Sequence, residues 1–165
     1  MSKSSRLAAA AVIVLAATGL SACGGGSTSA KGPEAAKRGV YTTAVDCADA
    51  GRLTFEDCAT AMASAVQIHE RDAPTYSSLR ACVAKEGEGK CEFTANAKYR
   101  PSLLAFLIIE STPPEAKPLY AHPKGEAGFR DLSNNTYTQD TEELTFSEHA
   151  QTKFEAHAGR GRGGH

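Results

Sequence analysis

The chain has 165 residues, with 18 basic and 19 acidic side chains and a formal net charge of −1. This balance excludes the strongly basic surface that non-specific nucleic-acid binding needs, so no nucleic-acid partner is expected. The length is typical of one domain.

The first 22 residues have the pattern of a bacterial lipoprotein signal peptide. Lys3 and Arg6 precede an uncharged run, residues 7–20, that is too short and too rich in alanine to span a bilayer comfortably. The run ends in Leu-Ser-Ala-Cys, residues 20–23, which resembles the lipobox of bacterial lipoproteins. We therefore expect cleavage before Cys23, lipid attachment to its thiol, and a membrane as partner. The alternative is an ordinary signal peptide with a chance cysteine.

A lipidated Cys23 would place the protein in the bacterial cell envelope, facing the periplasm. Two or three acyl chains anchor a protein durably, whereas one chain is marginal. Gly24 stands where an Asp would resemble an inner-membrane retention signal, which favours the outer membrane.

Composition divides the chain into four parts. These are the signal peptide (1–22), a flexible Gly- and Ser-rich tether (23–39), a single domain (40–154) and a disordered Gly/Arg/His tail (155–165). Removal of Lys3 and Arg6 leaves 16 basic and 19 acidic residues, so the mature chain is mildly acidic.

Two helices are predicted early in the domain. Thr54 is a candidate N-cap, and the helix it begins ends near Pro74. A second helix, 79–86, begins after Ser77 or Ser78 and stops at Gly87. Apolar residues at helical spacing form a stripe on the first helix: Phe55, Ala59, Met62, Val66 and His69. We expect these two helices to form a hairpin.

Four cysteines follow the tether: Cys47, Cys58, Cys82 and Cys91. Export predicts an oxidising environment, so two disulfides are expected. Cys58 would lie about 21 Å from the helix–helix turn and Cys82 about 7 Å. A disulfide requires Cα atoms within about 7 Å, which disfavours Cys58–Cys82. The sequential pairing Cys47–Cys58 and Cys82–Cys91 is favoured, and Cys47–Cys82 with Cys58–Cys91 stays open. The spacing does not suit zinc, and no metal site is predicted.

The second half of the domain is richer in strands. The apolar run 103–109 fits a buried strand or a core helix starting at Pro101, and we favour the helix. Short β-rich segments follow, and Asn134–Asn135 suits a tight hairpin turn. Residues 143–154 fit a last strand or a frayed helix. The expected fold class is α+β, a small disulfide-stapled domain with an N-terminal helical hairpin followed by a short antiparallel β segment.

The stretch 41–92 resembles the YgiB-like family of uncharacterised bacterial lipoproteins. The likeness is carried by Tyr41, the Asp46–Cys47 pair, Cys58, the turn "ERDAPTY" (70–76) and the loop "CVAKEGEGKC" (82–91), and it returns at "KPLYAHP" and "GFRDLSNNTYT". The resemblance implies a domain of unknown function with no assigned catalytic residues.

No fingerprint of a hydrolase, metalloprotease or nucleotide-binding protein occurs, so no catalytic residue and no cofactor is predicted. We expect a binding or scaffolding module whose carboxylate-rich edge, 46–57, engages an envelope protein. One alternative is an enzyme or accessory factor acting on an envelope metabolite or peptide, with acids near Glu70 and Asp72 or a cysteine kept reduced. The other is weak metal binding through a tail containing His149, His157 and His165. The run His69–Asp72 is expected to be a solvated helix end.

Overall fold

The computed structural model describes residues 37–123 and 127–158. The predicted signal peptide, Cys23 and the end of the predicted tail lie outside these ranges. The elements in chain order are β1 (Arg38–Tyr41), α1 (Ala44–Asp49), α2 (Phe55–Asp72), α3 (Leu79–Glu86), β2 (Cys91–Phe93), β3 (Tyr99–Pro101), β4 (Ala105–Ile109), β5 (Glu115–Ala121), β6 (Phe129–Arg130), β7 (Thr136–Tyr137), β8 (Leu144–Phe146) and α4 (Glu148–Ala158).

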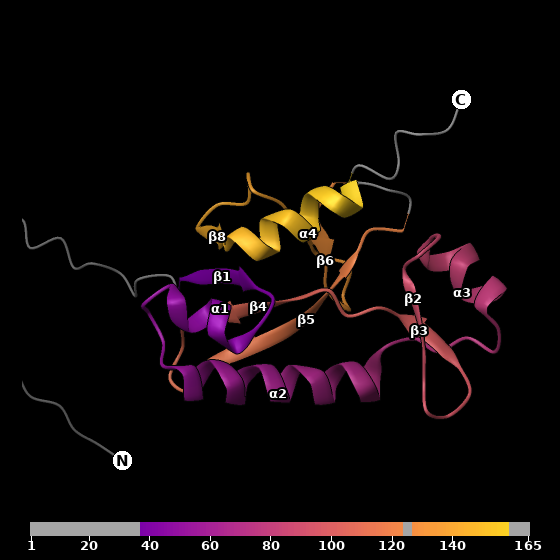
Figure 1. The fold of residues 1–165 in the computed structure, drawn as a ribbon, viewed down its shortest axis with the longest axis horizontal. Coiled ribbons are helices and arrows are strands. Elements are labelled where there is room, and N and C mark those ends of the chain that lie inside the picture. The colour runs from indigo at the N-terminus through magenta and orange to yellow at the C-terminus, as the bar shows by residue number, and fades with distance from the viewer. Residues whose placement is uncertain (1–36, 124–126, 159–165) are drawn as a thin grey trace, which may run out of the picture. The chain divides into compact units, whose positions relative to one another are not determined.

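A six-stranded sheet is the centre of the domain, with strand order β7-β6-β5-β4-β1-β8 (Figure 1). Its pairs are antiparallel except β1 and β8, which are parallel. The α+β class is therefore confirmed, but the expectation of a short β segment is wrong. The first and last strands in the chain pair side by side, and no local sequence pattern indicates that pairing.

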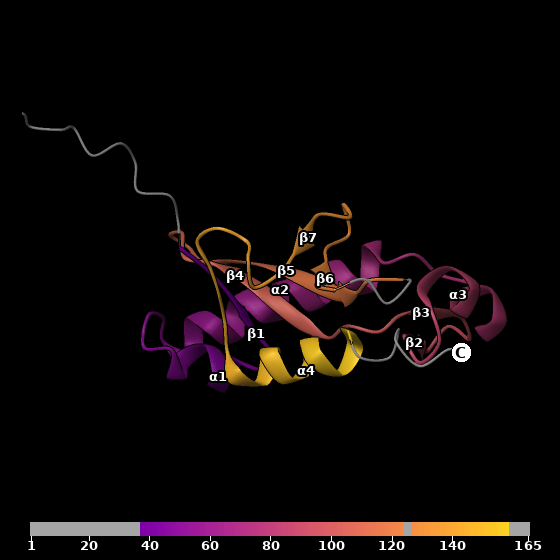
Figure 2. The same ribbon diagram turned by 90° about the horizontal axis from the view of Figure 1, so that it is seen from above.

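Helices cover both faces of the sheet (Figures 1 and 2). On one face Tyr41 and Ile108 pack with α1 and α2. On the other face Val40 and Leu107 pack near α4. Because neighbouring residues in a strand point to opposite faces, adjacent residues of β1 and β4 enter different cores. Three phenylalanines close the second core, with ring centroids 5.8–6.0 Å apart: Phe129, Phe146 and Phe154.

The predicted N-cap of α2 is confirmed, because the Thr54 hydroxyl accepts a hydrogen bond from the Asp57 amide at 3.1 Å. The predicted apolar stripe is only partly correct. Phe55 is 56% exposed, whereas a face of mostly small residues is buried: Cys58, Ala61, Met62, Ala65 and His69. Small side chains let the helix approach the sheet closely, so burial here follows residue size and geometry rather than hydrophobicity alone.

The predicted helix α3 is also confirmed, with Ser78 as N-cap and Gly87 after its last turn. Gly87 has φ +101°, and a Cβ there would lie 2.9 Å from the Pro123 carbonyl oxygen. The expected hairpin of α2 and α3 is wrong, because α3 packs on the two-stranded β2–β3 sheet instead (Figure 2). Helices also occur at the end of the domain, as α4 shows.

The apolar run 103–109 forms the central strand β4, so our preference for a helix is wrong. β4 lies between β1 and β5, and both of its faces are covered. A strand buried on both faces is apolar throughout, which removes the alternation that would have identified it. The predicted turn at Asn134 is confirmed, with φ +61° between β6 and β7.

Two disulfides join Cys47 to Cys58 and Cys82 to Cys91. This is the sequential pairing that the helix geometry favoured. The first bridge ties α1 to α2, and the second ties α3 to β2. Within the described ranges, no helix combines the length and the apolar character that crossing a membrane requires.

Candidate functional site

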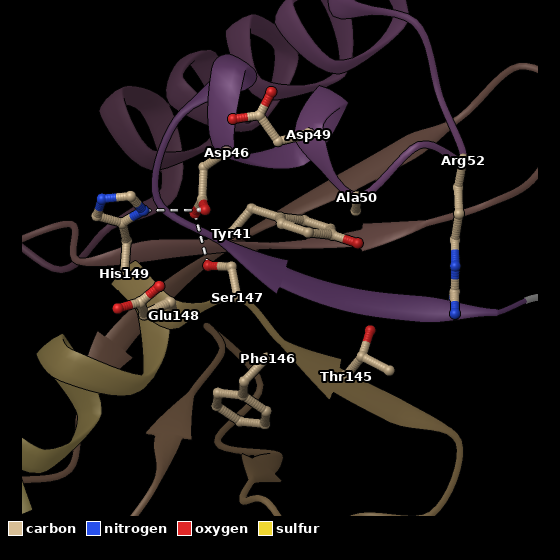
Figure 3. A pocket seen from close by; sticks show the side chains of 10 residues that line it. All are labelled: Tyr41, Asp46, Asp49, Ala50, Arg52, Thr145, Phe146, Ser147, Glu148 and His149. Atoms are coloured by element: carbon tan, nitrogen blue, oxygen red, sulfur yellow. Dashed lines mark hydrogen bonds and ion pairs between the residues drawn. The ribbon is translucent and has the colours of Figure 1, made fainter.

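A pocket of about 410 Å³ opens where the end of β1, helix α1, strand β8 and the start of α4 come together (Figure 3). Its lining residues are Tyr41, Asp46, Asp49, Ala50, Arg52, Thr145, Phe146, Ser147, Glu148 and His149.

Asp46 is the best-connected carboxylate of this pocket. One of its oxygens accepts hydrogen bonds from the Thr42 amide at 2.8 Å and the Ser147 hydroxyl at 2.6 Å, and the other contacts His149 Nδ1 at 3.2 Å. Burial opposes ionisation of Asp46, but these hydrogen bonds outweigh it and lower its pKa below the usual value. Asp46 is therefore a fixed negative charge at neutral pH.

Asp46, Ser147 and His149 are the residue types of a serine hydrolase triad, but their order is different. In a triad the histidine lies between serine and aspartate and takes the serine proton. Here the aspartate lies between the other two, and the Ser147 hydroxyl donates to Asp46. Ser147 also accepts a hydrogen bond from the Ala150 amide at 3.1 Å, as the residue preceding a helix does. This arrangement joins the starts of α1 and α4 and does not activate a nucleophile.

The rim of the pocket carries an excess of negative charge. Asp49 and Glu148 are exposed carboxylates on its two sides. The positive charge of Arg52 is balanced by Glu110, 3.0 Å away. The buried Tyr41 forms part of the wall, and burial raises the pKa of its hydroxyl, so that it stays neutral. Among its described lining residues, the pocket thus has more carboxylates than unpaired cationic groups.

The run from His69 to Asp72 does not form one reactive cluster. His69 is buried, with Nδ1 2.9 Å from the Tyr120 hydroxyl and Nε2 3.1 Å from Glu92. Arg71 and Asp72 instead form an ion pair with each other at 2.8 Å. The expectation of a solvated helix end is correct for Arg71 and Asp72 and wrong for His69. The only sequence feature that indicated burial of His69 was its position on the predicted helical stripe.

Glu92 connects this buried histidine to the β2–β3 hairpin. It accepts a hydrogen bond from Arg100 at 2.6 Å on its own hairpin and contacts His69 on α2. Burial opposes ionisation of Glu92, but Arg100 and His69 lower its pKa below the usual value. These charges therefore have structural roles.

The described cysteines and histidines do not form a metal site. Cys47, Cys58, Cys82 and Cys91 are all in disulfides, and the described residues contain no group of three or more side chains placed to hold a metal ion. His149 lies beside Asp46 and His157 lies in α4, whereas His165 is beyond the described residues.

Sequence reasoning identified Asp46 as part of a carboxylate-rich edge but missed most of its partners. Ser147 and His149 lie about one hundred residues further along the chain. Ser147 before a helical segment was a usable N-cap signal. No local sequence pattern indicates the hydrogen bond between Ser147 and Asp46, because the parallel pairing of β1 and β8 brings these two residues together.

The family model described as "Protein of unknown function (DUF1190)" matches residues 35–162, most of the chain. This protein belongs to the DUF1190 family. The resemblance to YgiB-like proteins is thereby confirmed.

Curated relatives of this DUF1190 chain include two UPF0441 proteins of Klebsiella pneumoniae, one from strain ATCC 700721 / MGH 78578 and one from strain 342. Each is 42% identical over 55 residues, which is 33% of this chain and 25% of the relative. The match thus spans a quarter of the length of these relatives. No solved structure has significant similarity to the chain.

Proposed function

We propose that this DUF1190 protein is a lipid-anchored binding module of the bacterial envelope, and that the pocket around Asp46 receives a lysine or arginine side chain of an envelope protein. The observation that carries this proposal is the arrangement of carboxylates. Asp46 is held ionised inside the pocket, while Asp49 and Glu148 flank its mouth.

Electrostatics supports a cationic ligand. Arg52, the arginine in the described lining, is paired with Glu110. Its charge therefore does not neutralise the carboxylates of the pocket. His149 is the other basic group there and is 76% exposed. Concave sites focus the field of like charges, which favours the approach of the opposite charge.

The lipobox at residues 20–23 supports the anchor. Acylation at Cys23 would hold the domain at a membrane, and the Gly- and Ser-rich segment after it suits a flexible tether. The module would then search the periplasmic space close to the membrane, with the outer membrane as the expected location.

A peptide titration tests the pocket. The probe is tetralysine with blocked ends, added to ¹⁵N-labelled protein in which both disulfides are formed. We expect saturable shifts of the amides at the end of α1 and the start of α4, weakened several-fold by D49N/E148Q. The control E56Q/E70Q removes two exposed carboxylates outside the pocket. Equal weakening by the control would show that only net charge matters and would contradict the pocket.

A cross-linking experiment tests the partner in the envelope. A photoreactive residue replaces Ala50, an exposed residue of the pocket wall, in the full chain. We expect a cross-link to a segment rich in Lys or Arg that is lost in D49N/E148Q and retained in E56Q/E70Q. A cross-link that persists in D49N/E148Q would reject the acidic pocket as the docking site.

The anchor is tested separately by intact mass of the protein from its native membrane. We expect a chain that starts at Cys23 and carries diacylglyceryl and acyl groups. C23A should leave the membrane fraction on lysis. An unlipidated native chain would remove the anchor and leave the pocket proposal to its own tests.

A further inference from the structure

A second pocket, of about 280 Å³, lies away from Asp46, where the α2–α3 connection, the end of α3 and the β6–β7 turn meet. Arg130 and Glu86 form its polar wall, and Lys85 and Asn134 are exposed residues of its lining. Its charge is opposite to that of the pocket around Asp46, so it needs a different kind of ligand.

Among the described residues of this lining, the one carboxylate, Glu86, already has two partners. Glu86 is 5% exposed, and one of its oxygens accepts a hydrogen bond from the Tyr76 hydroxyl at 2.6 Å. The other oxygen accepts a hydrogen bond from the Arg130 guanidinium. Glu86 therefore neutralises Arg130 and leaves no net negative charge at the pocket.

Arg130 retains unused hydrogen-bonding capacity. The residue is 6% exposed, and its Nε–H has no acceptor among the described residues. Its guanidinium carbon lies 5.4 Å from the centre of the Tyr120 ring, which orients the group on the sheet. A buried N–H donor without an acceptor costs free energy. A ligand oxygen that accepts a hydrogen bond from Arg130 would recover that cost.

Two lysines add positive charge. Lys85 is exposed at the pocket. Lys90 is 8% exposed and donates hydrogen bonds to the carbonyl oxygens of His122 and Pro123, not to a carboxylate. Among the described residues of the lining, Arg130 and Lys85 are thus two cations against one carboxylate, Glu86. The excess charge favours an anion.

The remaining wall is largely apolar and is formed by Pro74, Pro123 and Leu132. From this combination we propose that the pocket binds the carboxylate of a small apolar acid, the chemistry of a free amino-acid derivative or of a peptide C-terminus that ends in an apolar residue. The carboxylate would contact Arg130 and Lys85, and the apolar group would pack against the prolines. The site is separate from the pocket around Asp46 and does not depend on it.

The experiment is an NMR titration with N-acetyl-leucine, its neutral amide, and inorganic phosphate. We expect the acid to shift the amides around Lys85 and Asn134 saturably, with a dissociation constant on the order of 1 mM for a ligand of this size. The amide should not bind. N-acetyl-Gly-Gly-Leu distinguishes the sources, because tighter binding than the free acid identifies a peptide terminus and weaker binding identifies a small acid.

Matched variants keep the test decisive. K85Q should weaken the acid about threefold to fivefold, as expected for one exposed charge. The control K153Q removes a cation from α4, on the opposite face of the sheet, and should have no effect. R130K retains the charge but not the planar fork, and should weaken binding more than K85Q.

Three results would overturn the proposal outright, and a fourth would reject its ligand. They are the absence of a saturable shift, equal binding of the acid and its amide, and equal weakening by K85Q and K153Q. Tighter binding of phosphate than of the acid would also reject the carboxylate. The variant D49N/E148Q should bind the acid normally, so failure here and failure of the proposed function are distinguishable.

Discussion

Two regions of this domain are held together by different forces. The sheet core, formed by the six-stranded sheet with α1, α2 and α4, buries apolar side chains such as Leu107 and Phe129 on both faces of the sheet. The α3–β2–β3 unit buries charged groups, Glu86 and Lys90, and leaves Phe93 64% exposed. Its contacts with the sheet core include the Glu86–Arg130 and Glu92–His69 pairs.

Each region has one disulfide, and the two bridges close loops of similar length, with sequence separations of 11 and 9. Loop-closure entropy therefore contributes nearly the same stabilisation in both. The regions differ in what surrounds the bridge. The stability of the α3–β2–β3 unit therefore depends on its ion pairs with the sheet core. The unit buries few apolar side chains that could stabilise it without those pairs.

The largest effect is expected for R130M, which removes the cation beside Glu86. Leaving one member of a buried ion pair without its partner costs about 3–5 kcal/mol. Urea unfolding measures the loss, and hydrogen exchange should show α3 and β2–β3 opening before the sheet. The double variant R130M/E86M should recover most of the loss. A cost below about 1 kcal/mol for R130M would contradict this role of the pair.

A somewhat smaller effect is expected for L107A in the sheet core, where Leu107 is 1% exposed. Removing its buried methyl groups should cost about 3 kcal/mol from lost transfer energy and the cavity left behind. Because the sheet core is shared by most elements, amide hydrogen exchange in L107A should accelerate throughout the domain. Faster exchange confined to the α3–β2–β3 unit in L107A would contradict the view that the two regions are stabilised by different interactions.

The two disulfides should differ in how easily they are reduced. Cys47 and Cys58 are 2% and 0% exposed, whereas Cys91 is only partly buried. A mild phosphine under native conditions should therefore reduce Cys82–Cys91 first, which alkylation and mass spectrometry detect. C82A/C91A should cost about 2–3 kcal/mol for a loop of this length. Reduction of Cys47–Cys58 first would show that the sheet core opens more readily than the α3–β2–β3 unit.

Acid should weaken both regions through different carboxylates. The pKa of Asp46 and that of Glu92 are lower in the folded state than in an unfolded chain. Their stabilisation is therefore complete above the unfolded values, near pH 4, and is lost as the pH falls through the folded values. Unfolding at pH 7 and at about pH 3 measures this loss.

The variant D46N separates the contribution of Asp46 to acid sensitivity from that of Glu92. It should cost about 1–2 kcal/mol at neutral pH through weaker hydrogen bonds and should reduce the dependence of stability on acid. D49N, which alters an exposed carboxylate of the same pocket, should change neither. An unchanged acid profile in D46N would show that Asp46 does not join α1 to α4 as described.

The successful predictions concern short sequence distances. Thr54 and Ser78 cap helices through amides three residues ahead, and Gly87 ends α3 with a conformation that favours glycine. Helix length disfavoured Cys58–Cys82, and of the two remaining pairings the favoured sequential one is confirmed. The candidate pocket was only partly predictable, because Asp46 was evident as an acidic residue but its partners Ser147 and His149 were not.

The failures concern packing. Phe55 was placed in the core because it is apolar, yet the sheet accepts the side of α2 that carries small residues. The helix expected over 103–109 rests on Pro101 as a favoured first helical residue. The run lacks the alternation of a half-buried strand because other elements cover both faces of β4. α3 was expected to pack on α2, yet Cys82–Cys91 holds it to the β2–β3 hairpin.

The sequence by itself determined the lipobox pattern, the limits of α2 and α3 and the α+β class, and it disfavoured a Cys58–Cys82 bridge, since each depends on residues close together in the chain or on composition. Only the tertiary structure decided the order of the strands, the burial of His69 and the pairing of Glu86 with Arg130. Several of these contacts join segments far apart in the chain, such as Glu86 and Arg130, which are 44 residues apart, and the paired strands β1 and β8. Such contacts form only when the whole sheet is assembled, and no local pattern specifies them.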